Sequence, residues 1–82
     1  MKIVWDERKR QANLLKEGLD FAILDAEFFA AAQIGPAKHN RLRAVGEING
    51  IVTVIFIRLG TKGLSVIRMR PASRQETRQL DA

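Results

Sequence analysis

Hydrophobic and polar residues alternate along the second half of the chain with a period of two, which is the side-chain repeat of a β-strand. Residues 41–48 divide their side chains between two faces, with Arg41, Arg43, Val45 and Glu47 on one and Leu42, Ala44, Gly46 and Ile48 on the other. Residues 51–59 are apolar on both faces until Arg58, as expected of a central strand. Residues 64–70 continue the pattern, so the sequence predicts a three-stranded antiparallel meander.

The turns of this meander are marked by residues that tolerate a positive φ. Asn49-Gly50 is a strong signal for a two-residue hairpin, and Gly-Thr-Lys-Gly at 60–63 predicts the next turn. Pro71 ends the third strand. Within this strand, strict alternation predicts one face made of Leu64, Val66, Arg68 and Arg70, and another made of Ser65, Ile67 and Met69.

The first half of the chain has helical spacing after a short apolar strand at residues 2–5. Asp6 predicts the N-cap of a helix over residues 7–17, which Gly18 would end. Asp20 predicts the N-cap of a second helix over residues 21–32, whose core-facing stripe would be Phe21, Leu24 and Phe28. Gly35-Pro36 would stop this helix, and residues 37–40 would form a loop.

Ser73 and Glu76 have the spacing of a capping box, which predicts a short terminal helix that ends near Leu80. The predicted order is therefore β-α-α-β-β-β-α. This order indicates an α+β fold, in which an antiparallel sheet, with the early strand at an edge, packs against the two N-terminal helices. Because 82 residues can bury one modest core, we expect a single domain over residues 1–82.

Charge adds more to this picture than overall composition does. The net charge is +5, and it is concentrated in residues 37–82, which carry nine Lys/Arg against three Asp/Glu. This distribution predicts a surface for nucleic acid or an acidic protein, although a solvated face that serves solubility is the alternative. The absence of cysteine excludes disulfides and a cysteine nucleophile and fits a cytoplasmic location. No apolar run has the length of a membrane span.

The basic residues fall on several predicted elements rather than on one. Arginine suits phosphate because its guanidinium donates two parallel hydrogen bonds and stays charged at any working pH. If the strands pair as predicted, cations from strands and helices would face one polyanion: Lys9, Lys16, Arg41, Arg43, Arg58, Arg68, Arg70 and Arg74. The alternative is a solvent-facing sheet surface with scattered arginines.

Cleavage of RNA without a metal is one use for such a surface. The reaction needs a base for the ribose 2′-OH proton, cations for the charge that develops on phosphorus, and an acid for the leaving oxygen. His39, Glu47 and Glu76 are candidates for proton transfer, but each also has a structural explanation: a solvated loop, a cross-strand ion pair and the capping box. One histidine and no cysteine argue against a metal site, and no glycine-rich phosphate loop is present.

Three segments of the chain carry recognisable motifs in a fixed order. Residues 4–22 carry W-D-x-x-K at 5–9, then Asn13, K-x-G at 16–18 and Phe21. "RLRAVG" follows at 41–46 and "SVIRMRPASRQE" at 65–76. Together these segments resemble the BrnT family of toxins from bacterial type II toxin–antitoxin modules, and the resemblance extends over nearly the whole chain.

This resemblance implies a RelE-like fold and a ribonuclease that halts translation. It also implies a hetero-oligomer with a BrnA-like, DNA-binding antitoxin, which would neutralise the toxin and repress the shared promoter. Lys9, Lys16, Arg41, Arg70 and Glu76 fall on positions typical of the family. The chain departs from the family at Glu17, where histidine is usual, and at position 68, where a small residue is usual.

The leading hypothesis is a metal-independent endoribonuclease toxin that needs no cofactor. In it, Arg70 and Arg41 hold the phosphate and the transition state, Lys16 and Glu76 complete the catalytic set, and the other cations bind RNA. The alternative is a catalytically weak or inactive relative that serves as an antitoxin-binding and co-repressor module, because Glu17 replaces a ring that could exchange protons.

Overall fold

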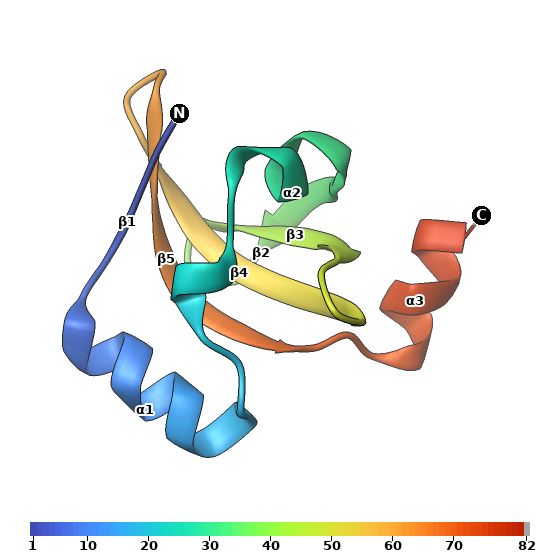
Figure 1. The fold of residues 1–82 in the computed structure, drawn as a ribbon. Helices are drawn as coiled ribbons and strands as arrows, with labels where there is room; N and C mark the ends of the chain where they lie inside the picture. Colours follow the sequence, from blue (N-terminus) through green and yellow to red (C-terminus); the bar gives the residue numbers. More distant parts are fainter. Residues whose placement is uncertain (82) are drawn as a thin grey trace.

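The computed structural model describes residues 1–81 as a five-stranded mixed sheet with three α-helices and one 3₁₀ helix (Figure 1). The helices are α1 (Glu7–Glu17), η1 (Phe21–Ile23), α2 (Ala26–Ala31) and α3 (Arg74–Asp81). The strands are β1 (Lys2–Trp5), β2 (Gln33–Ala37), β3 (Arg41–Glu47), β4 (Ile51–Leu59) and β5 (Gly63–Pro71). Their order in the sheet is β1-β5-β4-β3-β2, and only β1 pairs in parallel. The α+β class, the meander β3-β4-β5 and the edge position of β1 are confirmed.

The predicted helix over residues 21–32 is wrong. Asp20 caps only the single turn η1, and its side chain accepts the N–H of Ala22. Asp25 caps α2 instead, with its side chain accepting the N–H of Phe28 at 2.8 Å. Leu24 and Asp25, between the two short helices, have extended backbone conformations, and these interrupt the predicted helix.

Residues 35–40, where the sequence predicts the end of a helix followed by a loop, include part of a strand. β2 pairs antiparallel with β3 from Gln33↔Val45 to Ala37↔Arg41. Pro36 is compatible with this strand because β2 is at the edge of the sheet, where its missing N–H is not needed by a neighbour. Within residues 1–81 the predicted order β-α-α-β-β-β-α is therefore corrected by one additional strand after the second helix.

Several local predictions are confirmed. Asp6 caps α1, accepting from the N–H groups of Arg8 and Lys9, and Gly18 ends the helix with φ of 72°. The β3–β4 connection has positive φ at Asn49 and Gly50, and it is one residue longer than predicted because Ile48 is also outside the strands.

The core lies between one face of the sheet and the segment that contains η1 and α2. Phe21, Leu24 and Phe28 are buried there as predicted, together with Phe29, on the inward side chains of the central strands. Phe28 packs directly on the backbone of Gly46, where a Cβ atom would approach its ring to 3.0 Å. This aromatic layer thus covers one face of the sheet and leaves the opposite face available for a site.

The register of β5 contains a β-bulge that decides which face the arginines occupy. Ile55 pairs with Arg68 whereas Phe56 pairs with Val66, so Ile67 is the additional residue. Beyond the bulge, Met69 continues the buried side of the strand, and Arg68 and Arg70 lie on the opposite side. The predicted face of Leu64, Val66, Arg68 and Arg70 is wrong, because strict alternation does not hold through a bulge.

Two helices flank the face of the sheet that the core does not use. α1 contacts β5 and α3 contacts β3. Neither these helices nor α2 is long and apolar enough to cross a membrane, a statement that covers residues 1–81.

Candidate nucleic-acid interface

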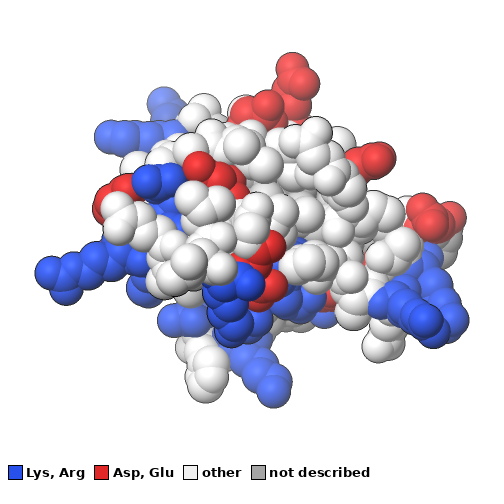
Figure 2. Space-filling model, turned by 60° about the horizontal axis from the view of Figure 1, so that its bottom comes forward, with Lys and Arg blue, Asp and Glu red and all other residues white. Residues whose placement is uncertain are grey.

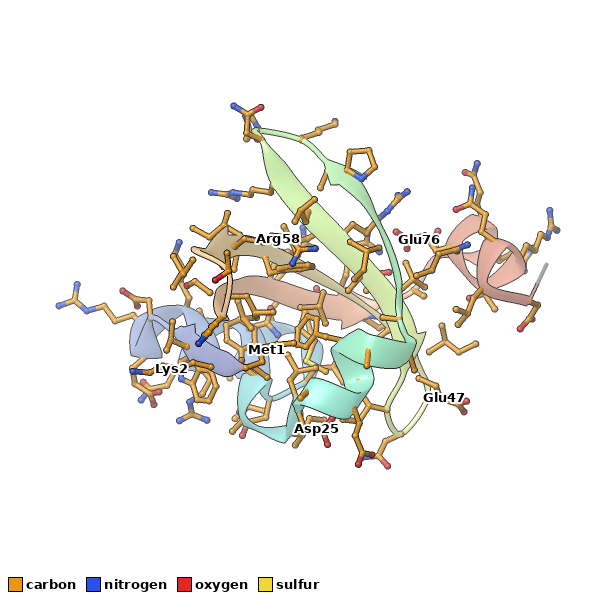
Figure 3. The ribbon with its side chains drawn as sticks, turned by 90° about the horizontal axis from the view of Figure 1, so that it is seen from above. Met1, Lys2, Asp25, Glu47, Arg58 and Glu76 are labelled. Atoms are coloured by element: carbon orange, nitrogen blue, oxygen red, sulfur yellow. The ribbon has the colours of Figure 1, made fainter. Side chains whose placement is uncertain are left out.

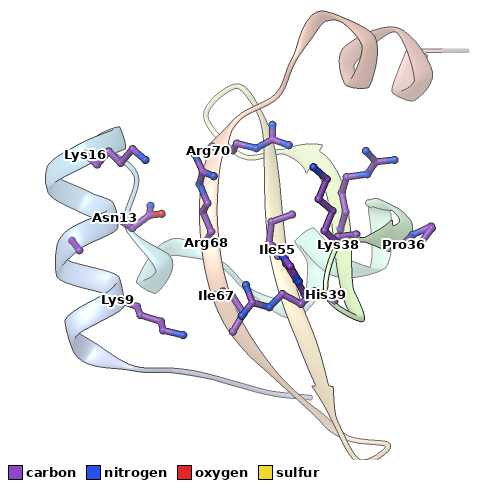
Figure 4. Close-up of a pocket in the computed structure, with 14 residues that line it drawn as sticks. Lys9, Asn13, Lys16, Pro36, Lys38, His39, Ile55, Ile67, Arg68 and Arg70 are labelled. Atoms are coloured by element: carbon purple, nitrogen blue, oxygen red, sulfur yellow. The ribbon is translucent and has the colours of Figure 1, made fainter.

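A groove of about 960 Å³ crosses this face between α1 and the turn that joins β2 to β3 (Figure 4). Its fourteen lining residues include no carboxylate and seven cations: Lys9, Lys16, Lys38, Arg41, Arg43, Arg68 and Arg70. Lysine and arginine side chains also project along the lower side of the view in Figure 2. A groove of this charge and volume suits a flexible polyanion better than a compact neutral ligand.

The α1 wall of the groove is fixed to the sheet by Asn13. β1 pairs with β5 only as far as Val66, so the next part of the β5 edge lacks a neighbouring strand. The Asn13 side chain takes that place: its Oδ1 accepts the Met69 N–H at 3.0 Å, and its Nδ2 donates to the Leu19 carbonyl at 3.0 Å. Lys9 and Lys16 are four residues before and three after Asn13, so the same helix face presents both to the groove.

Arg70 is held by a buried carboxylate beneath α3. The Arg70 guanidinium donates to both oxygens of Glu76, at 2.8 and 3.0 Å. Glu76 is only 4% exposed, and its Oε1 also accepts the Thr53 hydroxyl at 2.9 Å and the Ser73 N–H at 2.8 Å. Arg43 approaches the second oxygen at 3.5 Å. Figure 3 shows Glu76 between α3 and the sheet. The cluster fixes one face of the Arg70 side chain and leaves 28% of it exposed.

The hydrogen bonds of this cluster lower the pKa of Glu76 to about 2, chiefly through Arg70 and then through the Ser73 N–H and the Thr53 hydroxyl, against an opposing effect of burial. The same carboxylate raises the pKa of Arg70. Glu76 is therefore ionised at neutral pH and already fully engaged. Its capping-box role is confirmed, since the Ser73 hydroxyl also accepts the Glu76 N–H. The geometry makes it a residue that positions Arg70, and not a free acid or base.

Arg68 has a carboxylate partner of a different kind. Its guanidinium contacts one oxygen of Glu17 at 3.4 Å, and the Arg68 side chain is 47% exposed. The two residues are 51 positions apart in sequence and meet where the end of α1 comes near β5. The ion pair thus joins the end of α1 to β5 beside the groove.

Most of the predicted basic residues are brought together. Six of them line the groove: Lys9, Lys16, Arg41, Arg43, Arg68 and Arg70. Arg58 does not, because it pairs in register with Leu64 and extends from the core side of β4 (Figure 3). Arg74 is exposed at the start of α3, also outside the groove.

The candidates for proton transfer are separated. Glu47 is exposed at the far end of β3, whereas His39 lines the groove from the β2–β3 turn with φ of 61°. Sequence reasoning missed three contributors: Lys38 beside His39, Asn13 on α1 and Thr53 beneath Glu76. Only Asn13 gave a signal, because it belongs to the BrnT-like segment. Across residues 1–81, no group of three or more His, Cys, Asp or Glu side chains is placed to hold a metal ion.

Comparison with known proteins gives the class of this molecule. Residues 5–76 match the family model described as "Ribonuclease toxin, BrnT, of type II toxin-antitoxin system". Such ribonuclease toxins of type II systems are a class that implies an antitoxin partner. The chain belongs to the BrnT family.

A solved structure agrees with this assignment. The chain is 55% identical to the Brucella abortus ribonuclease toxin BrnT, whose crystal structure was determined at 1.1 Å resolution. The match has a TM-score of 0.83 and covers 90% of this chain and 99% of that one. No curated protein matches the chain.

Proposed function

We propose that this chain is a metal-independent endoribonuclease that cleaves RNA and thereby inhibits translation in the cytoplasm. The observation that carries the proposal is the groove itself, which gathers seven cations and no carboxylate on one face of the sheet. Membership of a ribonuclease toxin family supports the reaction class. We further propose that residues 1–82 act as a single toxin domain with a RelE-like fold.

In this proposal the sugar–phosphate chain of the RNA lies along the groove. Arg70 and Arg41 bind the phosphate to be cleaved, and the bidentate contact with Glu76 keeps the Arg70 side chain in one orientation before RNA arrives. Lys9, Lys16, Arg43 and Arg68 bind neighbouring phosphates, each of which adds salt-sensitive affinity. Arg58 and Arg74, which are outside the groove, would act only on more distant parts of the RNA.

The reaction is attack of a ribose 2′ oxygen on the adjacent phosphorus. A P–O bond to the 2′ oxygen forms and the P–O5′ bond breaks, which leaves a 2′,3′-cyclic phosphate and a 5′-hydroxyl. The 2′-OH proton passes to a base in the groove, and the departing O5′ receives a proton from an acid. Arg41 and Arg70 stabilise the extra negative charge on the phosphoryl oxygens. Among the lining residues, His39 and Lys16 are the groups suited to the two proton transfers.

Substitution of Arg70 by alanine tests this function. We expect Arg70→Ala to reduce RNA cleavage at least about a hundredfold, since it removes a charge-stabilising donor from the transition state. Purified chain would be incubated with RNA in the presence of a chelator, and the cyclic phosphate and 5′-hydroxyl ends would be identified. Arg8→Ala is the matched control, because Arg8 is exposed on α1 and outside the groove. Equal loss in both variants, or no cleavage by the wild-type chain, would contradict the proposal.

The antitoxin is the second part of the proposal. A BrnA-like, DNA-binding antitoxin would form a hetero-oligomer with this chain, neutralise it and repress the shared promoter. We expect expression of the chain alone to stop growth and co-expression of the antitoxin to restore it.

A non-catalytic role is favoured by one specific contact. Glu17 is paired with Arg68, so its carboxylate does not stand free as a proton acceptor in place of the histidine usual in the family. If the chain is only an antitoxin-binding co-repressor, Arg70→Ala will leave antitoxin binding and promoter repression unchanged, and the wild-type chain will leave RNA intact.

A further inference from the structure

A second cavity opens on the same face of the sheet, beyond Arg43 from the cationic groove. It has a volume of about 430 Å³ and lies between the β2–β3 pair and α3. Its lining residues are Gln33, Ile34, Gly35, Arg43, Val45 and Gln79. The volume is within the range of roughly 300–1,000 Å³ that is usual for small-molecule sites.

The cavity exists because of how α3 is fixed. Glu76 directs one face of α3 toward the sheet, and Gln79 is one turn further along the same face. Gln79 therefore lines the cavity from the α3 side, and Gln33, which is opposite Val45 in the register, lines it from β2; both residues are exposed. Val45 is buried and, with the glycine at position 35, gives the cavity an apolar floor.

The lining chemistry differs from that of the groove. The cavity contains one cation in place of seven, and two carboxamides that each offer donors and an acceptor. The single guanidinium, that of Arg43, also lines the groove, so the cavity has no cation of its own for a further phosphate. A planar ring with hydrogen-bonding edges fits this combination, because amides pair with base edges and a guanidinium plane stacks on a ring.

We infer that this cavity binds one nucleobase of the RNA whose phosphates occupy the groove. The inference rests on the proposed function and deepens it, since it names the part of the substrate that the groove does not read. Arg43 lines both cavities, so a nucleotide bound there can place its phosphate on the groove side and its base between Gln33 and Gln79. The carboxamides of Gln33 and Gln79 would then set the base preference of cleavage.

Non-cleavable oligonucleotides test this inference directly. The probes are six-residue oligonucleotides with 2′-O-methyl riboses, each with one base replaced by hydrogen and all phosphates retained. Binding would be measured by fluorescence anisotropy at fixed salt. We expect base removal at one position to weaken binding to the wild-type chain about five- to tenfold, the effect of losing roughly one good base-edge contact. In the double variant Gln33→Ala/Gln79→Ala, the same removal should change binding less than twofold.

Gln75→Ala is the matched control, because Gln75 is an exposed glutamine on α3 that does not line the cavity. It should keep the wild-type response to base removal. Three results would overturn the inference: equal binding of all single-base-deleted probes by the wild-type chain, an unchanged response in the double variant, or no binding of any probe. If the chain cleaves RNA but binds all these probes equally, the proposed function stands and the base-binding inference is wrong. If binding depends on the base but the chain does not cleave RNA, the base-binding inference stands and the proposed endonuclease activity is wrong.

Discussion

Two arginines of β5 face the same groove, yet the carboxylates that hold them differ in nearly every respect. Glu76 is 4% exposed and accepts from Arg70, Thr53 and the Ser73 backbone. Glu17 makes one contact of 3.4 Å with an Arg68 side chain that is 47% exposed. The first carboxylate belongs to the structure of the domain, and the second adjusts the charge of its surface.

The difference follows from the free energy of each ion pair. A buried carboxylate must be fully hydrogen-bonded, because removing one member leaves charges and donors without partners in a medium of low dielectric. An exposed pair competes with water and salt, so it contributes little to stability. The groove therefore contains one arginine whose position is set by a buried cluster and another whose charge is only partly neutralised, by a single contact with Glu17.

The largest expected effect comes from Glu76→Ala. This change leaves Arg70, the Thr53 hydroxyl and the Ser73 N–H without their common acceptor and removes the main contact of α3 with the sheet. We expect the free energy of unfolding to fall by about 3 kcal/mol, as for a buried pair that loses one partner. Urea denaturation followed by circular dichroism measures it. A loss no larger than that of Glu17→Ala, the matched control, would erase the distinction between the two carboxylates.

Lowering the pH should also show how much the buried Glu76 contributes to stability. Because the pKa of Glu76 falls from its ordinary 4.5 to about 2 on folding, its ionised form stabilises the native state fully above about pH 4.5. This stabilisation is lost as the pH falls from 4.5 toward 2, and we expect it to amount to about 2 kcal/mol after allowance for the exposed part of Arg70. The measurement is the difference in unfolding free energy between wild type and Glu76→Gln at pH 7, 5, 4 and 3. A difference that stays constant over this range would contradict the assignment.

A smaller effect should follow from Asn13→Ala, which acts on the wall that carries Glu17. The variant leaves the Met69 N–H and the Leu19 carbonyl without their partner, and we expect a loss of about 1–2 kcal/mol in unfolding free energy. Hydrogen exchange at the Met69 amide should accelerate in the variant, whereas exchange at the Val54 amide in the central strand should change only with global stability. Unchanged protection of the Met69 amide would show that Asn13 does not hold α1 to the sheet.

The smallest change in stability should come from Glu17→Gln, below about 1 kcal/mol. Its effect should instead be on RNA binding, because Arg68 then presents its full charge to the groove. We expect affinity to rise at low salt and the plot of log K against log salt concentration to become steeper by up to about 0.7. Arg68→Ala is the companion variant and should change the slope in the opposite direction. An equal slope in all three proteins would place Arg68 outside the bound RNA.

Much of the fold could be predicted because its signals are local. Asp6 and Gly18 define α1, Asn49-Gly50 defines a hairpin, and Ser73 with Glu76 defines the start of α3. The element that was missed, β2, contains Gly35-Pro36, which locally predicts a break. Its strand conformation depends on pairing with β3, and that pairing is a tertiary contact that propensity does not contain.

The candidate site could be predicted only in its composition. The basic residues of the second half and the resemblance to BrnT identified six of the cations that line the groove. The partners of those cations could not be found in this way. Glu17 meets Arg68 across 51 residues, and the acceptor role of Glu76 toward Arg70 was hidden by its simpler role in the capping box.

The extra residue in β5 couples the length of this strand to the face that its arginines occupy. If Ile67 were deleted, strict alternation from Val66 would still keep Met69 in the core and Arg68 and Arg70 on the groove side. One further residue inserted between Val66 and Arg68 without a second bulge would instead turn both arginines toward the core and bring Met69 to the groove side. A relative could thus keep every basic residue of the groove and still lose their common face through a single insertion.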